Sequence, residues 1–189
     1  ILDAGGIPRL LDLLSSTSLK AKENAVSAVA QLALKNPDNQ KEIAQHGGIP
    51  RLVTTLTEAS SNSKELAQQQ ISMLAASAIW NVADNNLSNQ TLLLKEGAVP
   101  PVVALLGNPA PEMQMNAAGA LAALARNHPE SQGAVARAGA IAPLCNLVRE
   151  AGMPETREAA AAALWACATS NAPNQATIAK LGGIEPLVN

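Results

Sequence analysis

Two histidines and two cysteines are the first candidates in this chain for binding a metal or for acting as a base or nucleophile. His46 stands before a glycine pair and His128 lies in an Asn-His-Pro turn. Neither has an acidic residue or a cysteine at the spacing that a metal site or a catalytic relay requires. We therefore expect both histidines to be solvated polar residues. Cys145 and Cys167 lack an activating neighbour, so we expect inert, buried thiols.

The glycine pairs offer no alternative chemistry. They do not form G-x-G-x-x-G or a phosphate-binding loop, because each one opens a segment of a different pattern that usually contains proline. Two cysteines in 189 residues cannot form a disulfide framework, which favours a reducing compartment. The sequence therefore predicts no catalytic residue, no cofactor and no metal, and it indicates that the chain is not an enzyme.

The composition is that of a folded, helix-rich chain. Of the residues, 48% are hydrophobic, 1% are aromatic and 38 are alanine, which favours closely packed helices. The net charge is -2 and the basic residues are scattered singly, so we expect no nucleic-acid partner. The longest apolar run, 159–168, is shorter than the roughly 18 residues of a membrane-spanning helix. We expect a soluble intracellular protein, cytoplasmic or nuclear.

A glycine-containing element recurs five times and divides the chain into repeats. It reads GGIPRLLDLL at its first occurrence and GAVPPVVALL at its third, and its first glycines are 42, 50, 42 and 43 residues apart. Those glycines are Gly5, Gly47, Gly97, Gly139 and Gly182. We predict a single solenoid over 1–189 with the units 5–46, 47–96, 97–138, 139–181 and a partial unit 182–189.

Each unit predicts three helices. A short first helix ends at the glycine, which readily takes the positive φ that closes a helix. The second helix carries a proline in its first turn, where the missing N–H costs nothing; these are Pro8, Pro50, Pro100 and Pro143. An alanine-rich third helix follows, in which Ala25, Val29 and Leu32 recur at the spacing of one buried face.

The second unit contains eight extra residues near Ser60 to Gln70. The segment Lys64 to Gln70 is rich in helix formers, which favours an N-terminal extension of the third helix. The alternative is a projection from one rim that contacts a partner.

The period, the three helices and the G-[GA]-[IV]-P-x-[LV] element resemble armadillo repeats over the whole chain. The resemblance implies an all-α, right-handed superhelix with about three complete and two partial three-helix repeats. It also implies that the third helices line a concave groove which binds extended peptides or proteins. We expect the sequence to be a piece of a longer array, because neither end carries a polar capping unit.

In nuclear-import receptors of this family, a tryptophan and an asparagine four residues apart on each third helix grip a basic peptide. The tryptophan column here reads Ser27, Ser77, Gly119 and Ala162. The asparagine column reads Gln31, Asn81, Ala123 and Ala166. Only Asn81 matches, with Gln31 as a longer amide, so a nuclear-import role through this groove is not expected.

Helical geometry places a wide, weakly charged set of residues on the groove. The predicted partner-binding residues are Ser27, Gln31, Ser77, Trp80, Asn81, Asp84, Asn116, Arg126 and Trp165. Trp80 and Trp165 share one column, two repeats apart. They are either aromatic anchors for a partner or side chains that fill gaps beside alanine.

These observations predict a scaffold that binds a partner peptide or protein along the third-helix groove. Two alternatives remain open. The chain could be the substrate-recruiting or regulatory part of a larger enzyme such as a ubiquitin ligase, as the resemblance allows. It could also be a structural solenoid that associates end to end through exposed apolar ends.

Overall fold

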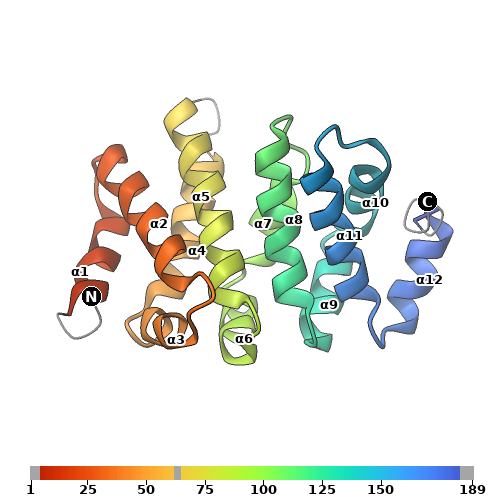
Figure 1. The fold of residues 1–189 in the computed structure, drawn as a ribbon, viewed down its shortest axis with the longest axis horizontal. Coiled ribbons are helices and arrows are strands. Elements are labelled where there is room, and N and C mark those ends of the chain that lie inside the picture. The colour runs from red at the N-terminus through yellow and green to blue at the C-terminus, as the bar shows by residue number, and fades with distance from the viewer. Residues whose placement is uncertain (1–4, 62–64, 184–189) are drawn as a thin grey trace.

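The computed structural model describes residues 5–61 and 65–183, and every regular element in them is helical (Figure 1). In chain order the elements are α1 (Gly6–Asp12), the 3-10 helix η2 (Leu13–Ser15), α2 (Leu19–Ala33), α3 (Pro37–Gln45), α4 (Gly48–Ser61), α5 (Leu66–Ala83), α6 (Leu87–Lys95), α7 (Val99–Leu105), α8 (Pro111–Ala125), α9 (Pro129–Arg137), α10 (Ile141–Glu150), α11 (Pro154–Ala168) and α12 (Ala172–Lys180).

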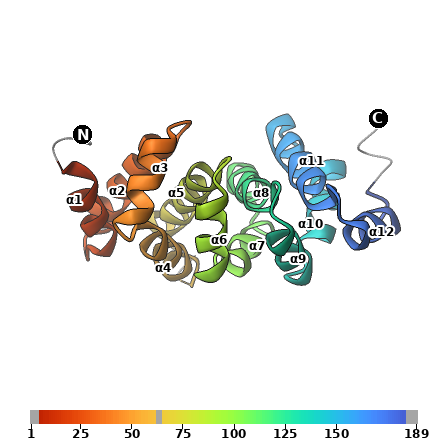
Figure 2. The ribbon, with the colours of Figure 1, turned by 90° about the horizontal axis from the view of Figure 1, so that it is seen from below.

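The helices form an elongated array in which each type occupies its own layer. The third helices α2, α5, α8 and α11 lie side by side along one face, and α1, α4, α7 and α10 cover the opposite face (Figures 1 and 2). The first helices α3, α6, α9 and α12 run along one edge (Figure 1). This arrangement confirms the predicted all-helical fold with three helices per repeat.

The predicted helix ends are confirmed at the glycines. All five landmark glycines have φ between 61° and 81°, and Gly47, with φ of 71°, separates α3 from α4. This left-handed conformation costs glycine little because it has no Cβ. The chain therefore turns at the same point in successive repeats.

Each first helix begins at a side-chain cap. Asn36, Asn86 and Asn171 accept hydrogen bonds from the backbone N–H three residues further on, at 3.0, 3.1 and 3.2 Å. His128 takes the same place in the third unit, where its Nδ1 accepts from the N–H of Ser131 at 3.1 Å. His128 is 7% exposed, so the prediction of a solvated histidine is wrong. The cap buries one ring nitrogen, and a hydrogen bond of 2.9 Å between Nε2 and the Thr91 hydroxyl buries the other.

The extra residues of the second unit lengthen two helices. α5 has 18 residues where α2, α8 and α11 have 15, which confirms the predicted extension. α4 has 14 residues where α1 and α7 have 7, so the second helix is lengthened as well. Lys64 lies outside the described residues.

A continuous apolar core, built mainly of alanine, leucine, isoleucine and valine, runs through the array. Cys145 and Cys167 are 1% and 0% exposed, which confirms their predicted burial. Burial raises the pKa of Cys167 to about 12. It also raises the pKa of Cys145, although the nearby Arg149 guanidinium opposes that rise. Both thiols stay protonated near neutral pH and are therefore poor nucleophiles.

A ladder of glutamines joins successive repeats. The amide Nε2 of each buried glutamine donates to a backbone carbonyl of the next third helix: Gln40 to Asn81 at 2.8 Å, Gln90 to Ala123 at 2.7 Å and Gln132 to Ala166 at 3.0 Å. In return, the Oε1 atoms of Gln40 and Gln132 accept from Asn86 and Asn171 of the next unit. These bonds fix how one repeat sits on the next.

Candidate protein-binding face

The face formed by α2, α5, α8 and α11, called the third-helix face below, carries all nine residues predicted for the groove. Each belongs to one of these helices or to its C-terminal cap. Gln31 and Trp165 are exposed, and Trp165 is 59% exposed. The half-buried residues are Ser27, Ser77, Trp80, Asn81, Asp84, Asn116 and Arg126.

Five of the nine converge on one shallow cavity of about 300 Å³ between α2 and α5. Its lining residues are Gln31, Leu34, Lys35, Ser77, Trp80, Asn81 and Asp84. Leu34 and Lys35 were not among the predicted site residues. The cavity offers an indole, several polar groups and both signs of charge within one site.

Trp80 contributes to this cavity and also supports the next repeat. A Cβ built on Gly119 of α8 would lie 2.4 Å from Cε3 of Trp80, so the indole lies directly on the backbone of α8. The ring is half-buried and packs against the apolar core. Trp80 therefore has a packing role whether or not it also contacts a partner.

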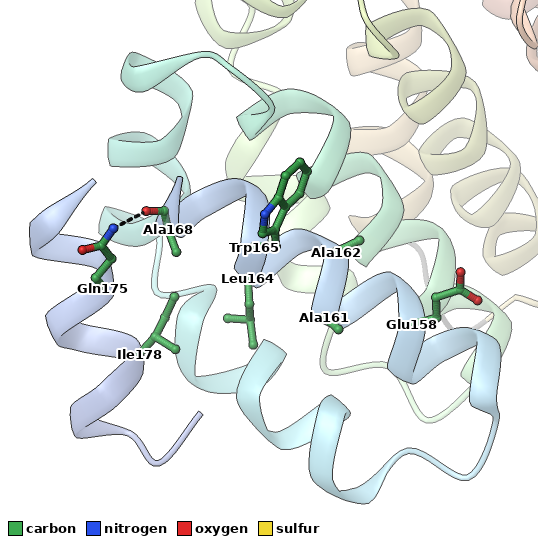
Figure 3. A pocket seen from close by; sticks show the side chains of 8 residues that line it. All are labelled: Glu158, Ala161, Ala162, Leu164, Trp165, Ala168, Gln175 and Ile178. Carbon is green, nitrogen blue, oxygen red and sulfur yellow. Dashed lines mark hydrogen bonds between the residues drawn. The ribbon is translucent and has the colours of Figure 1, made fainter. Parts of the chain in front are cut away.

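Trp165 occupies the same column of α11 but is much more exposed. Figure 3 shows its ring standing off α11 beside a pocket that α12 borders on the other side. The guanidinium carbon of Arg126 lies 5.8 Å from the ring centroid, within the range of a cation–π interaction. Arg126 and Trp165 thus form a second group of predicted residues, next to the first along the face.

The other predicted residues do not all line one of these two sites. The amide of Asn81 donates to the carbonyl of Ala30 at 2.9 Å, and that of Asn116 donates to Glu112 at 2.7 Å. Each amide therefore keeps its side-chain oxygen and one N–H for other contacts. Ser27 and Asn116 line neither the cavity beside Trp80 nor the pocket beside Trp165.

Asp84 and Arg126 are charged residues of the third-helix face, and Lys35 lines the same cavity as Asp84. Asp84 and Arg126 occupy equivalent positions, as the C-terminal caps of α5 and α8, in consecutive repeats. Neither forms an ion pair with another described residue, and the buried Nε of Arg126 has no hydrogen-bond partner there. Asp84 and Arg126 therefore place opposite charges one repeat apart, with Lys35 beside Asp84 in the same cavity and the Arg126 guanidinium over the Trp165 ring.

The described residues show little sign of other chemistry. They contain no group of three or more His, Cys, Asp or Glu residues that could hold a metal. The exposed ring of His46 pairs with Glu42 of its own helix at 2.9 Å. Within the described part of the chain, no helix is both long and apolar enough to cross a membrane.

The repeats match a known family. The model of the armadillo/beta-catenin-like repeat matches residues 1–34, 88–126 and 128–168. The chain belongs to the armadillo repeat family. No curated protein matches its sequence.

Solved structures, two of them designed armadillo repeat proteins, share the fold over nearly the whole chain. A designed armadillo repeat protein is 26% identical with a TM-score of 0.85, over 96% of this chain and 73% of that one. An armadillo repeat protein computationally designed for modular peptide recognition is also 26% identical, with a TM-score of 0.82 over 96% and 73% of the two chains. An engineered protein is 31% identical with a TM-score of 0.87, over 100% and 44%.

Proposed function

We propose that this armadillo chain, as one solenoid over 1–189, is a protein-interaction scaffold and not an enzyme. It binds an extended segment of a partner protein along the third-helix face. The observation that carries the proposal is the cavity in which Gln31, Trp80 and Asp84 converge on this face. The similar armadillo protein designed for modular peptide recognition adds support. The two free, buried thiols agree with an intracellular setting.

The residues of the face suggest the chemistry of the bound segment. Its apolar side chains meet the indoles of Trp80 and Trp165, which offer large contact areas at low entropic cost. Its backbone meets the amides of Gln31, Asn81 and Asn116. A recruiting role within a larger enzyme would use the same contacts, so the sequence of the bound segment would then identify the substrates.

The charges of Asp84 and Arg126 predict an order of side chains in the bound segment. A basic residue faces Asp84 and an acidic residue faces Arg126, one repeat further along. Such rim charges contribute modestly to affinity but strongly to the selection of partners. The segment therefore carries one charge of each sign, in an order fixed by its direction along the face.

The test selects binders from a pooled library of short peptides with the native protein and with Asp84→Lys/Arg126→Glu. This variant exchanges the two charges, keeps the net charge and leaves the packing of Trp80 on α8 intact. Peptides selected by the native protein should lose about tenfold in affinity for the variant, close to the sum of two exposed charge pairs. The variant should select the reversed order of charges.

The matched control is Lys41→Glu/Glu96→Lys, which exchanges two exposed charges of the first helices, away from the third-helix face. This control should bind the native peptides unchanged. Peptides that bind all three proteins equally would place the site elsewhere, and a folded protein that binds no peptide would reject the proposal.

A further inference from the structure

The junction between the second and third repeats contains a cavity that the peptide groove does not explain. Its volume is about 310 Å³, and its lining comes from α4, α5, α8 and the segment between α7 and α8. The first turns of α5 and α8 lie at the edge of the array opposite α6 and α9 (Figure 1). The lining includes Ser60, Ser72, Asn108, Leu105, Pro109 and Met113, none of which was predicted for the groove.

Two serine hydroxyls of this lining lack a hydrogen-bond partner among the described residues. Ser72 is 2% exposed, and its Oγ is buried and unpaired. The Oγ of Ser60 is also buried and unpaired. Unpaired buried hydroxyls cost free energy, so two of them on one cavity indicate a hydrogen-bonding occupant. The cavity is larger than a single bridging water needs, and its volume is in the range of small-molecule sites.

Asn108 adds a donor to the same cavity. Its Oδ1 accepts from the N–H of Ala110 at 2.9 Å, and its Nδ2 makes no hydrogen bond to another described residue. The lining contains no charged residue. A charged ligand would lose its water there without meeting an opposite charge, so the site favours a neutral ligand.

The cavity lies where this repeat carries a short side chain in place of a long one. Lys22 of α2 and Gln114 of α8 occupy the column of Ser72 in the two flanking third helices. Lys22 reaches Glu58 of the next repeat at 3.1 Å, and Gln114 donates to the carbonyl of Leu106 at 3.4 Å. The shorter side chain of Ser72 leaves its hydroxyl unpaired and the space beside it open.

The extra residues of the second unit also contribute to the site. Ser60 lies near the end of α4, which has 14 residues where α1 and α7 have 7. The lengthened helix therefore brings a second hydroxyl to the cavity, at a point that the shorter second helices do not reach. This gives the insertion a role beyond the extension of α5.

We propose that this cavity binds a neutral carboxamide group carried on a small apolar frame. A carboxamide has two donors and an acceptor oxygen, so it can meet both serine hydroxyls and the amide of Asn108 without carrying a charge. Its apolar frame lies against Leu105 and Met113. The same chemistry occurs in free small amides and in the glutamine side chain of a partner. The site is independent of peptide binding along the third-helix face.

The methionine methyl groups provide the test. Met113 lines the cavity, whereas Met73, Met115 and Met153 do not. In NMR spectra of protein labelled with carbon-13 in these methyl groups, isobutyramide should shift the Met113 signal and leave the other three unchanged. The shift should saturate with a dissociation constant on the order of millimolar, because the probe has few heavy atoms. Isobutyrate and isobutylamine, which are charged, should bind about tenfold more weakly.

Ser72→Ala removes one of the unpaired hydroxyls. It should weaken isobutyramide binding about fivefold without lowering the midpoint of urea unfolding, because the hydroxyl has no partner within the folded protein. A serine with a merely structural role would show the opposite pattern. Ser77→Ala, a matched change on the same helix outside this cavity, should leave binding unchanged. Ser72→Gln introduces the residue type of Gln114 and should abolish binding by filling the space.

A blocked Ala-Gln-Ala peptide, with blocked Ala-Glu-Ala as its control, separates the two sources of the amide. A Met113 shift with the glutamine peptide assigns the site to a partner's side chain, and a shift with isobutyramide alone assigns it to a free small amide. No Met113 shift with either neutral probe would leave water as the occupant and overturn the proposal. Equal affinity for the charged analogues, or unchanged binding by Ser72→Ala, would also overturn it.

Discussion

Side chains of opposite size meet where α5 packs on α8. Trp80 covers Gly119 so closely that the two residues act as one packing unit. Glycine within a helix ordinarily costs up to about 1 kcal/mol relative to alanine. Gly119 therefore lowers the intrinsic stability of α8, while it permits a large aromatic contact between repeats.

We expect Gly119→Ala to destabilise the protein by about 1–3 kcal/mol, although the same change in an open helix would stabilise it. The cause is overlap between the new methyl group and the indole. Urea unfolding measures the effect. In a double-mutant cycle, Trp80→Ala should abolish the penalty and leave Gly119→Ala neutral or stabilising. If the effects of the two changes on the free energy of unfolding simply add, Trp80 and Gly119 do not act as one packing unit.

The third unit departs from the other repeats at two residues, and both departures leave buried polar atoms unpaired. His128 stands where Asn86 and Asn171 donate to a preceding glutamine, and the Oε1 of Gln90 has no partner. Ser131 stands in the column of three buried asparagines, Asn39, Asn89 and Asn174, and its Oγ also has no partner. An unpaired buried polar atom is costly, so this junction is weaker than its neighbours.

His128→Asn/Ser131→Asn should stabilise the protein by about 1–2 kcal/mol. The new amides would reach Gln90 and the carbonyls that the asparagines of the other units already use. The gain is partly offset by loss of the 2.9 Å bond between His128 and Thr91. Thermal or urea unfolding measures the change. Asn86→Ala is the opposite control and should destabilise, because it removes both a cap and a bond to Gln40.

At the scale of elements, the third helices begin in two different ways. The side chain of Ser18 accepts from the N–H of Ala21 at 3.3 Å and caps α2. Glu65, Ala110 and Met153 precede α5, α8 and α11 without a side-chain cap. The uncapped starts leave backbone N–H groups to water. Their cost is tolerated because burial of the apolar faces supplies most of the helix stability.

Glu65→Ser should stabilise the protein by about 0.5–1 kcal/mol, since serine can cap α5 and Glu65 is exposed. Ser18→Ala should destabilise it by about 1 kcal/mol. Unfolding in urea measures both variants, and Glu65→Ala separates the cap from the loss of charge. A gain with alanine equal to that with serine would assign the effect to charge.

At the scale of the whole molecule, each repeat is stabilised mainly by the repeats next to it in the array. Each third helix contacts chiefly its neighbours, so local stability depends on the junctions at both sides. α5 and α8 have third helices on both sides, whereas α12 lies at the end of the described array (Figure 1). We therefore expect amide exchange to be slowest in α5 and α8 and fastest in α12.

Hydrogen exchange also tests the ladder. Gln132→Ala removes bonds to Ala166 and Thr169 and leaves Asn171 without an acceptor, so it should speed exchange in α11 and α12. Gln175→Ala removes a single bond within its own repeat and should have little effect. Equal effects of the two changes would mean that the cross-repeat bonds do not control junction stability.

The sequence by itself determined the helices and their ends, because those depend on local backbone preferences. Glycines with positive φ and prolines in first turns act within a few residues of their own positions, whereas the asparagine caps were not predicted. The repeated columns also determined the core, including both cysteines, since equivalent positions share an environment. For the same reason the sequence assigned all nine candidate residues to the third helices.

Only the tertiary structure decided how equivalent residues differ. Trp80 and Trp165 share a column, yet one is half-buried on Gly119 and the other is exposed, because burial depends on what the next repeat places opposite. His128 is polar in sequence but buried, since it caps a helix and bonds to Thr91 of the previous repeat. The contacts of Trp80 with Gly119 and of Thr91 with His128 join residues at least 37 positions apart, and no local preference specifies them.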